Sequence, residues 1–270
     1  MLADQHIHSS CSDDADDTML DMAIASAAWG VTDVCFTDHC DLEDPETAVE
    51  SESCFDYWPK ALEQFREAKE KAPVRVRIGV EIGAANHCPE RARQVAATEG
   101  LDLVMGSIHN LRGLPDFYYL KYESEAHCLQ LLDRYADELV EYAALDCFDV
   151  MSHIGYTRRY MQRAGFDIAF GLDRFGDRIE TALKILIQNG RGIELNCSSP
   201  KLDPEPTPTP VMEVLRLYRQ LGGEIITVGS DGHRISMAGK RIRWGHEVLK
   251  EAGFRYAALF EKRKPVFYEL

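Results

Sequence analysis

Six of the nine histidines follow short apolar or β-branched runs, at positions where a strand is expected to end. An imidazole nitrogen can bind a divalent metal ion or move a proton, so either chemistry is open to a histidine in such a place. One such histidine would be an ordinary structural or surface residue, whereas six in equivalent positions favour a shared metal site. The six are His6, His8, His39, His109, His153 and His233.

The first two of these histidines lie in a segment that alternates in the manner of a strand. Residues 4–8 read Asp-Gln-His-Ile-His, and alternation puts Asp4, His6 and His8 on one face. The two imidazoles then lie about 7 Å apart along the strand and can approach one ion. Asp4, one step further back, is placed to accept a hydrogen bond from an imidazole and fix its tautomer.

Carboxylates at the ends of other apolar runs are further candidate metal ligands, and the thiols are weaker candidates. Glu81, Glu194 and Asp231 each lie at the end of such a run, and a carboxylate can bridge two metal ions that imidazoles also bind. The eight cysteines form no C-x-x-C pair, so a zinc ribbon or thioredoxin-type motif is not predicted. Cys11 and Cys40 lie close in sequence to candidate histidines, but thiolates rarely share a site with hard oxygen ligands.

The elements that must position these side chains alternate between strand and helix. Seven apolar or β-branched segments predict strands, and helical patterns lie between them. This alternation predicts a parallel sheet with crossover helices, and seven units come close to the eight of a TIM barrel. In such barrels the C-terminal strand ends converge on one site. The predicted strands are 2–8, 32–37, 74–82, 101–108, 147–152, 192–195 and 224–229, and the predicted helices 18–29, 57–71, 89–98, 123–144, 172–188, 211–220 and 244–252.

The composition narrows the class of protein. The chain has 270 residues, with 30 Lys+Arg against 45 Asp+Glu, hence a net charge of −15. This charge argues against nucleic-acid or anionic-membrane binding, and an anionic substrate needs a locally positive site. No apolar run approaches the roughly 20 residues that span a bilayer, and the N-terminus lacks the features of a secretory signal. We expect a cytoplasmic protein whose partner is a small molecule.

The motifs resemble a known family in their order and spacing. They lie at 4–8, 37–39, 79–83, 106–109, 152–153, 194–196 and 229–233. Together they resemble the PHP (polymerase and histidinol phosphatase) superfamily, and the stretch 106–117 resembles its histidinol-phosphate phosphatase branch. The resemblance implies a single PHP domain over residues 1–270, folded as an α/β, distorted (β/α)7 TIM-like barrel with the metal site at the C-terminal ends of the strands.

The resemblance also implies three divalent ions. Glu81 would bridge the first and second ions, and Asp14, with Asp13 as its neighbouring competitor, would reach the third from an acidic loop. Imidazoles and carboxylates together suit zinc, manganese or iron. The first ion takes His6, His8, Glu81 and Asp231, the second Glu81, His109 and His153, and the third Asp14, His39 and His233.

Phosphate recognition is expected from the loop after residue 153. The family carries a phosphate-binding arginine there, which either Arg158 or Arg159 could match, and Arg158 is favoured. A second basic position of the family falls on Lys201, where the usual Gly-Leu-Arg is replaced. An ammonium there supplies charge without the bidentate fork of an arginine.

The implied activity is hydrolysis of L-histidinol phosphate, a step of histidine biosynthesis, by a metal-dependent phosphomonoesterase. Catalysis is expected from Glu81 and Arg158, with Asp231 or His39 as possible sources of the leaving group's proton. One alternative keeps the site and changes the substrate to another phosphorylated metabolite or nucleotide, including diesters. Another is a noncatalytic, metal-stabilised scaffold, which the complete ligand set disfavours.

Overall fold

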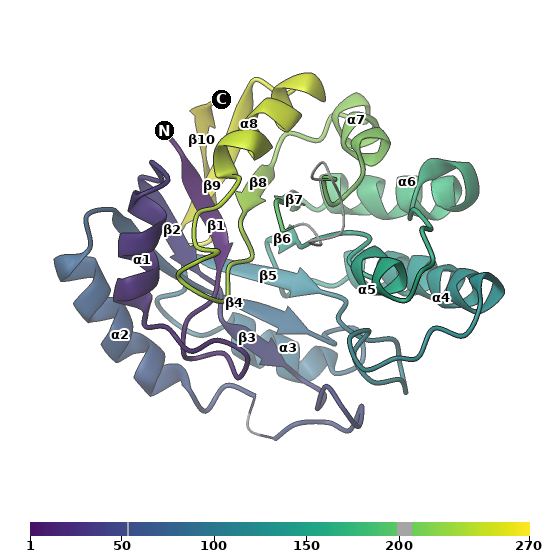
Figure 1. Ribbon diagram of the computed structural model, residues 1–270, viewed down its shortest axis with the longest axis horizontal. Helices are drawn as coiled ribbons and strands as arrows, with labels where there is room; N and C mark the ends of the chain where they lie inside the picture. Colours follow the sequence, from purple (N-terminus) through teal and green to yellow (C-terminus); the bar gives the residue numbers. More distant parts are fainter. Residues whose placement is uncertain (53, 199–206) are drawn as a thin grey trace.

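A computed structural model describes residues 1–52, 54–198 and 207–270. All seven predicted strands are present and pair in parallel, in the order β1-β2-β4-β5-β6-β7-β8. Backbone hydrogen bonds from His8 to Gly232 (3.0 Å) and from Asp231 to His6 (2.8 Å) join the two ends of this order. The result is a nearly closed, distorted TIM-like barrel (Figure 1). The strands are β1 (Ala3–Ile7), β2 (Asp33–Phe36), β4 (Arg75–Gly83), β5 (Leu103–Ser107), β6 (Val150–Met151), β7 (Gly192–Asn196) and β8 (Ile226–Gly229).

The seven predicted helices are present and surround the strands. Serine or threonine side chains cap two of them, because Thr18 and Ser124 accept hydrogen bonds from the first turns of α1 and α4. Apolar faces of the helices bury a continuous core against the sheet. The predicted helices are observed as α1 (Met19–Ala27), α2 (Trp58–Lys71), α3 (Pro89–Ala96), α4 (Glu125–Ala143), α6 (Leu172–Gln188), α7 (Met212–Gln220) and α8 (Ile242–Glu251).

Four elements of the described residues lie outside the prediction. The short strand β3 (His39–Asp41) pairs with β4, and the one-turn-and-a-half helix α5 (Arg158–Arg163) follows β6. Two C-terminal strands, β9 (Tyr256–Glu261) and β10 (Lys264–Glu269), form an antiparallel hairpin. Phe260 of β9 packs on a small apolar cluster from the strands. β3 and α5 are too short for sequence patterns to detect reliably, whereas the hairpin lies outside the strand–helix alternation on which the prediction depended.

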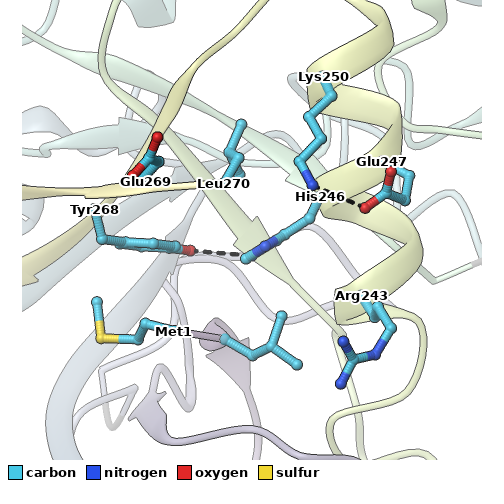
Figure 2. Close-up of a pocket in the computed structure, with 9 residues that line it drawn as sticks. Met1, Arg243, His246, Glu247, Lys250, Tyr268, Glu269 and Leu270 are labelled. Atoms are coloured by element: carbon cyan, nitrogen blue, oxygen red, sulfur yellow. Dashed lines mark hydrogen bonds and ion pairs between the residues drawn. The ribbon is translucent and has the colours of Figure 1, made fainter.

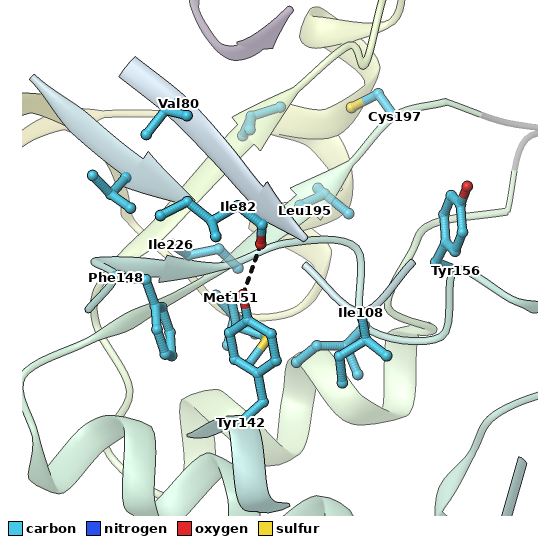
Figure 3. Close-up of a cluster of buried hydrophobic side chains, with 14 of the residues drawn as sticks. Val80, Ile82, Ile108, Tyr142, Phe148, Met151, Tyr156, Leu195, Cys197 and Ile226 are labelled. Atoms are coloured by element: carbon cyan, nitrogen blue, oxygen red, sulfur yellow. Dashed lines mark hydrogen bonds between the residues drawn. The ribbon is translucent and has the colours of Figure 1, made fainter. Parts of the chain in front are cut away.

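One part of the core packs against the C-terminal ends of β4 and β5. Tyr142 of α4 donates a hydrogen bond to the carbonyl of Ile82 (2.7 Å), and its hydroxyl accepts one from the backbone of Ser107 (3.1 Å) (Figure 3). The contact requires glycine at position 106, where a Cβ would lie 2.6 Å from the Tyr142 ring. Packing of α4 therefore holds the C-terminal ends of β4 and β5 in place.

None of the helices in the described part of the chain combines the length and apolarity needed to cross a membrane.

Candidate metal centre

Glu81, near the end of β4, lies at the middle of the predicted ligands. Its carboxylate is fully buried, and Oε1 lies 2.8 Å from His153 Nε2 and 3.1 Å from His109 Nε2. Its other oxygen, Oε2, lies 3.0 Å from His39 Nδ1 and 3.2 Å from His6 Nε2. One carboxylate thus faces two separate sets of imidazoles, the arrangement needed for a bridging ligand.

The histidines of β1 meet the residue that follows β8. The Nε2 atoms of His6 and His8 lie only 3.1 Å apart, and His8 Nε2 lies 3.5 Å from Asp231 Oδ1. Asp231 adopts a positive φ of 52°, in the left-handed region that aspartate tolerates better than most non-glycine residues. The four side chains predicted for the first ion therefore come together.

The third predicted group also assembles, at the mouth of the site. His39 Nε2 lies 3.3 Å from His233 Nε2, and Asp14 Oδ2 lies 3.1 Å from the same His233 atom. Asp14 Oδ1 approaches His39 Nε2 at 3.8 Å. It is thus Asp14, rather than its neighbour Asp13, whose carboxylate faces the two imidazoles.

Protein partners on the far side of the rings orient four of the histidines. His6 Nδ1 lies 2.8 Å from Glu194, and His109 Nδ1 lies 2.7 Å from Asp41. Ser12 and Ser152 hydroxyls lie 3.2 and 3.3 Å from Nδ1 of His8 and His153. A proton held on each Nδ1 leaves an Nε2 lone pair facing the centre.

The predicted role of Asp4 is wrong. Its carboxylate accepts hydrogen bonds from the backbone (2.9 Å) and hydroxyl (2.5 Å) of Ser230, and from the backbone of His6 (3.3 Å). The imidazole partner is Glu194 of β7, whose side chain reaches His6 past the intervening strand β8, at Gly229, where a Cβ would lie 2.3 Å from both side chains. Sequence alternation gives the face of a strand but not the strand order that decides which side chains meet on that face.

The buried carboxylates remain ionised. Burial alone raises the pKa of Glu81, but the surrounding histidines outweigh it and hold that pKa well below its ordinary value. Burial also raises the pKa of Asp231, but His8 and Arg159 lower it by more, so the net pKa of Asp231 lies well below its ordinary value. Burial lowers the pKa of His6, His39 and His109, but neighbouring carboxylates, Glu81 among them, outweigh it and raise the net pKa of all three. Anionic oxygens therefore face imidazoles that hold a proton until a metal ion displaces it.

The donor set fits divalent metal ions. Glu81 Oε2 and His39 Nδ1 are both buried without a hydrogen-bond partner although they face one another at 3.0 Å. Buried ligand atoms that lack a hydrogen-bond partner are what bound ions would satisfy. Within the described residues, four overlapping groups have ligand atoms within 4.8 Å: His6/His8/Glu81, Glu81/His109/His153, His8/His39/His233 and His39/Asp41/His109.

Of the two predicted phosphate-binding residues within the described part of the chain, one reaches this centre. Both terminal nitrogens of Arg159 lie 3.3 Å from Asp231 Oδ2, and the guanidinium stacks 4.7 Å above the Tyr156 ring. Arg158, the residue favoured from the sequence, instead pairs with the exposed Asp167 at 3.0 Å. Successive residues of helix α5 point about 100° apart, so only one of the pair can face inward. Lys201 lies outside the described residues.

The sequence did not predict the roles of two residues of the site. Asp41, on the unpredicted strand β3, joins His39 and His109 in one of the four groups. Glu194 was noted at a strand end, but its contacts with the His6 ring and with the backbone of His153 (2.8 Å) had no sequence signal. Cys11 and Cys40 belong to none of the groups found among the described residues.

A cleft of about 980 Å³ opens onto the centre. His39, His109 and Asp14 line its inner end, and tyrosines and acidic residues line the rest, among them Asp116 and Tyr160. A second hollow of about 480 Å³ lies at the opposite end of β1 (Figure 2), where His246 and Tyr268 point toward one another. None of the four candidate metal groups lies in the second hollow.

Comparisons with known proteins agree with this arrangement. A family model described as "PHP domain" matches residues 4–198. A Clostridium acetobutylicum protein named "Probable histidinol-phosphatase" is 26% identical, over 100% of this chain and 97% of that protein. The histidinol-phosphatase of Lactococcus lactis subsp. lactis is 24% identical, over 97% and 95%. A solved structure of the L. lactis histidinol phosphate phosphatase, complexed with zinc, L-histidinol and phosphate, has a TM-score of 0.77 and 23% identity over 98% of both chains, which shows a shared fold.

Proposed function

The chain belongs to the PHP domain family, and from that membership we propose that it hydrolyses L-histidinol phosphate to L-histidinol and inorganic phosphate. The observation that carries the proposal is the convergence of four predicted imidazole ligands on the two oxygens of Glu81: His6, His39, His109 and His153. The full-length relatives named histidinol-phosphatase support the choice of substrate.

The centre would hold three divalent ions in the three predicted groups, with Asp41 as a further candidate ligand. Bound ions of this kind supply Lewis acidity and activate water for attack on phosphorus. Zinc in the related L. lactis structure supports zinc among the candidates. Manganese and iron suit the same donors.

Arg159 is the residue of this chain that would bind the phosphate dianion. Its guanidinium lies at the centre, and Asp231 and the Tyr156 ring fix its direction. A planar fork so held can bind two phosphate oxygens at once and neutralise charge as the ester bond breaks. Arg158 pairs with the exposed Asp167 instead, so we assign to Arg159 the phosphate-binding role that the sequence favoured for Arg158.

The cleft beyond the centre suits a leaving group that carries a positive charge. Asp56, Asp116 and Glu43 line it together with Tyr118 and other tyrosines, and acids and aromatic faces both attract cations. L-Histidinol carries an amine and an imidazole, whereas a nucleic acid would bring many phosphates against these carboxylates. The lining therefore supports a small cationic ester over a polyanionic diester.

The test is phosphate release from three substrates with Mn²⁺ or Zn²⁺, each assayed with and without a chelator. We expect L-histidinol phosphate to be hydrolysed with the highest kcat/KM, p-nitrophenyl phosphate more slowly, and bis(p-nitrophenyl) phosphate least. Preference for the diester would overturn the monoesterase assignment. Hydrolysis of p-nitrophenyl phosphate without preference for histidinol phosphate would overturn only the substrate. No metal-dependent hydrolysis of any of them would leave the noncatalytic alternative.

A further inference from the structure

Asp38, between Thr37 and the candidate ligand His39, is a buried carboxylate that the centre leaves without a direct role. It belongs to none of the candidate metal groups among the described residues. Its oxygens accept three hydrogen bonds from the loop after β1. They come from the backbone of Ser9 (2.6 Å), the hydroxyl of Ser9 (2.8 Å) and the hydroxyl of Ser12 (2.8 Å). Asp38 therefore holds this loop rather than a metal ion.

Ser12 passes the influence of Asp38 on to two histidines. A serine hydroxyl has one proton to donate, and Ser12 donates it to Asp38. The same oxygen accepts the backbone N–H of His39 at 3.0 Å and lies 3.2 Å from His8 Nδ1. With its only proton directed at Asp38, Ser12 can only accept from His8, so the proton of that ring lies on Nδ1.

The other nitrogen of His8 faces the centre. His8 Nε2 lies 3.1 Å from His6 Nε2 and 3.5 Å from Asp231 Oδ1. A proton on Nδ1 leaves Nε2 with a free lone pair, the form that a metal ion requires. Glu194 acts on His6 through one hydrogen bond, and Asp38 acts on His8 through two.

We propose that Asp38 is a positioning residue, which through the Ser12 hydroxyl fixes the His8 tautomer with its proton on Nδ1 and so presents Nε2 to a metal ion. The same hydroxyl holds the backbone of His39, so the relay links ligands of the first and third predicted ions. The inference rests on the proposed metal centre but not on the identity of the substrate.

Two measurements on the purified protein test the relay. Long-range ¹H–¹⁵N spectra of the metal-free protein, at a pH where His8 is neutral, report which nitrogen of His8 carries the proton. Competition with a chromophoric chelator reports the affinity for Zn²⁺. Ser12→Ala removes the relay oxygen with little change in volume, and Ser12→Thr keeps a hydroxyl. Ser10→Ala is the matched control, because the Ser10 hydroxyl in the same loop bonds to Gln64 (3.0 Å).

We expect the Nδ1–H tautomer in wild type and Ser10→Ala, and a mixture in Ser12→Ala with about 10- to 100-fold weaker Zn²⁺ binding at one site. Ser12→Thr should restore most of the affinity. Asp38→Asn should weaken Zn²⁺ binding less in the Ser12→Ala background than in wild type, because the part of its effect that passes through Ser12 is already lost and only its bonds to Ser9 remain. A His8 proton on Nε2 in the wild type, which needs no variant to observe, would overturn the inference. Equal Zn²⁺ affinity in Ser12→Ala and Ser10→Ala would also overturn it. Failure of wild type to hydrolyse histidinol phosphate would overturn the proposed function alone.

Discussion

Glu81 is the residue on which the predicted centre depends, because each of its oxygens faces a different set of imidazoles. Replacing it with glutamine keeps the shape and removes one charge and one bridging oxygen. We expect Glu81→Gln to lose several orders of magnitude in kcat and part of its bound metal, while circular dichroism stays unchanged. Turnover above about a tenth of wild type, with the full metal content, would argue against a bridging role.

The two neighbouring arginines offer a matched pair of variants. Arg159 lies against Asp231, whereas Arg158 pairs with exposed Asp167. Loss of one charge-assisted contact costs about 1.5–3 kcal/mol, which is roughly 10- to 150-fold in kcat/KM. We expect this loss for Arg159→Ala in steady-state assays with histidinol phosphate, and less than about twofold for Arg158→Ala. The reverse order would restore the assignment made from the sequence.

At the residue scale, much of the candidate site could be predicted, because histidines and carboxylates at the ends of apolar strands stand out in a sequence. All nine predicted ligands lie within one centre, including Asp14, for which sequence left Asp13 as an alternative. The choice between Arg158 and Arg159 could not be predicted, since it depends on where a short helix begins. The role of Glu194 depends on the strand order, which separates β7 from β1 by β8 alone, and on the glycine of β8 that lets its side chain pass.

At the scale of elements, the loop after β1 acts as a single unit. Asp38 and Ser12 fix its backbone, and it carries Asp14 to the mouth of the centre. We expect Asp14→Ala to lose one of three bound ions, because two imidazoles alone rarely complete a site. Asp13→Ala is the control. Metal analysis after dialysis distinguishes them, and three equivalents on Asp14→Ala would remove it from the ligand set.

The contact between α8 and β10 gives a pH dependence that is separate from the centre. His246 is buried beside Tyr268, and burial, aided by Lys250 and Arg243, lowers its pKa to about 4. The fold therefore favours the neutral ring, so its contribution is complete above about pH 6.5 and is lost as the pH falls toward 4.

We expect wild type to lose more stability than His246→Gln between pH 7 and pH 5, because glutamine has no proton to take up. Urea unfolding of both proteins at the two pH values, after removal of metal, measures the difference. Equal losses in the two proteins would show that His246 does not titrate in this range.

The elements themselves were predictable where their period was clear. All seven barrel strands and seven helices follow from alternation and amphipathic spacing. The three-residue strand β3 and the short helix α5 are set by tertiary contacts, with β3 aligned so that His39 pairs in register with Glu81. The hairpin of β9 and β10 stands outside the alternation on which the prediction depended.

At the scale of the whole molecule, barrel closure and charge act together. The barrel gathers carboxylates from strands far apart in the sequence at one end, in a chain whose net charge is −15. Such a gathering is stable only with compensating cations, which the histidines supply in part and bound divalent ions would complete. The sequence predicts this concentration of charge, but only the closed barrel brings it around one carboxylate.

Titration of the metal-free protein with Zn²⁺ or Mn²⁺, while phosphate release from L-histidinol phosphate is followed, tests the central claim most directly. The account predicts no release after chelation, recovery as ions are added, and saturation near three equivalents per chain. Full activity in the chelated protein, or no phosphate release at any metal content from a folded protein that binds the ions, would contradict it.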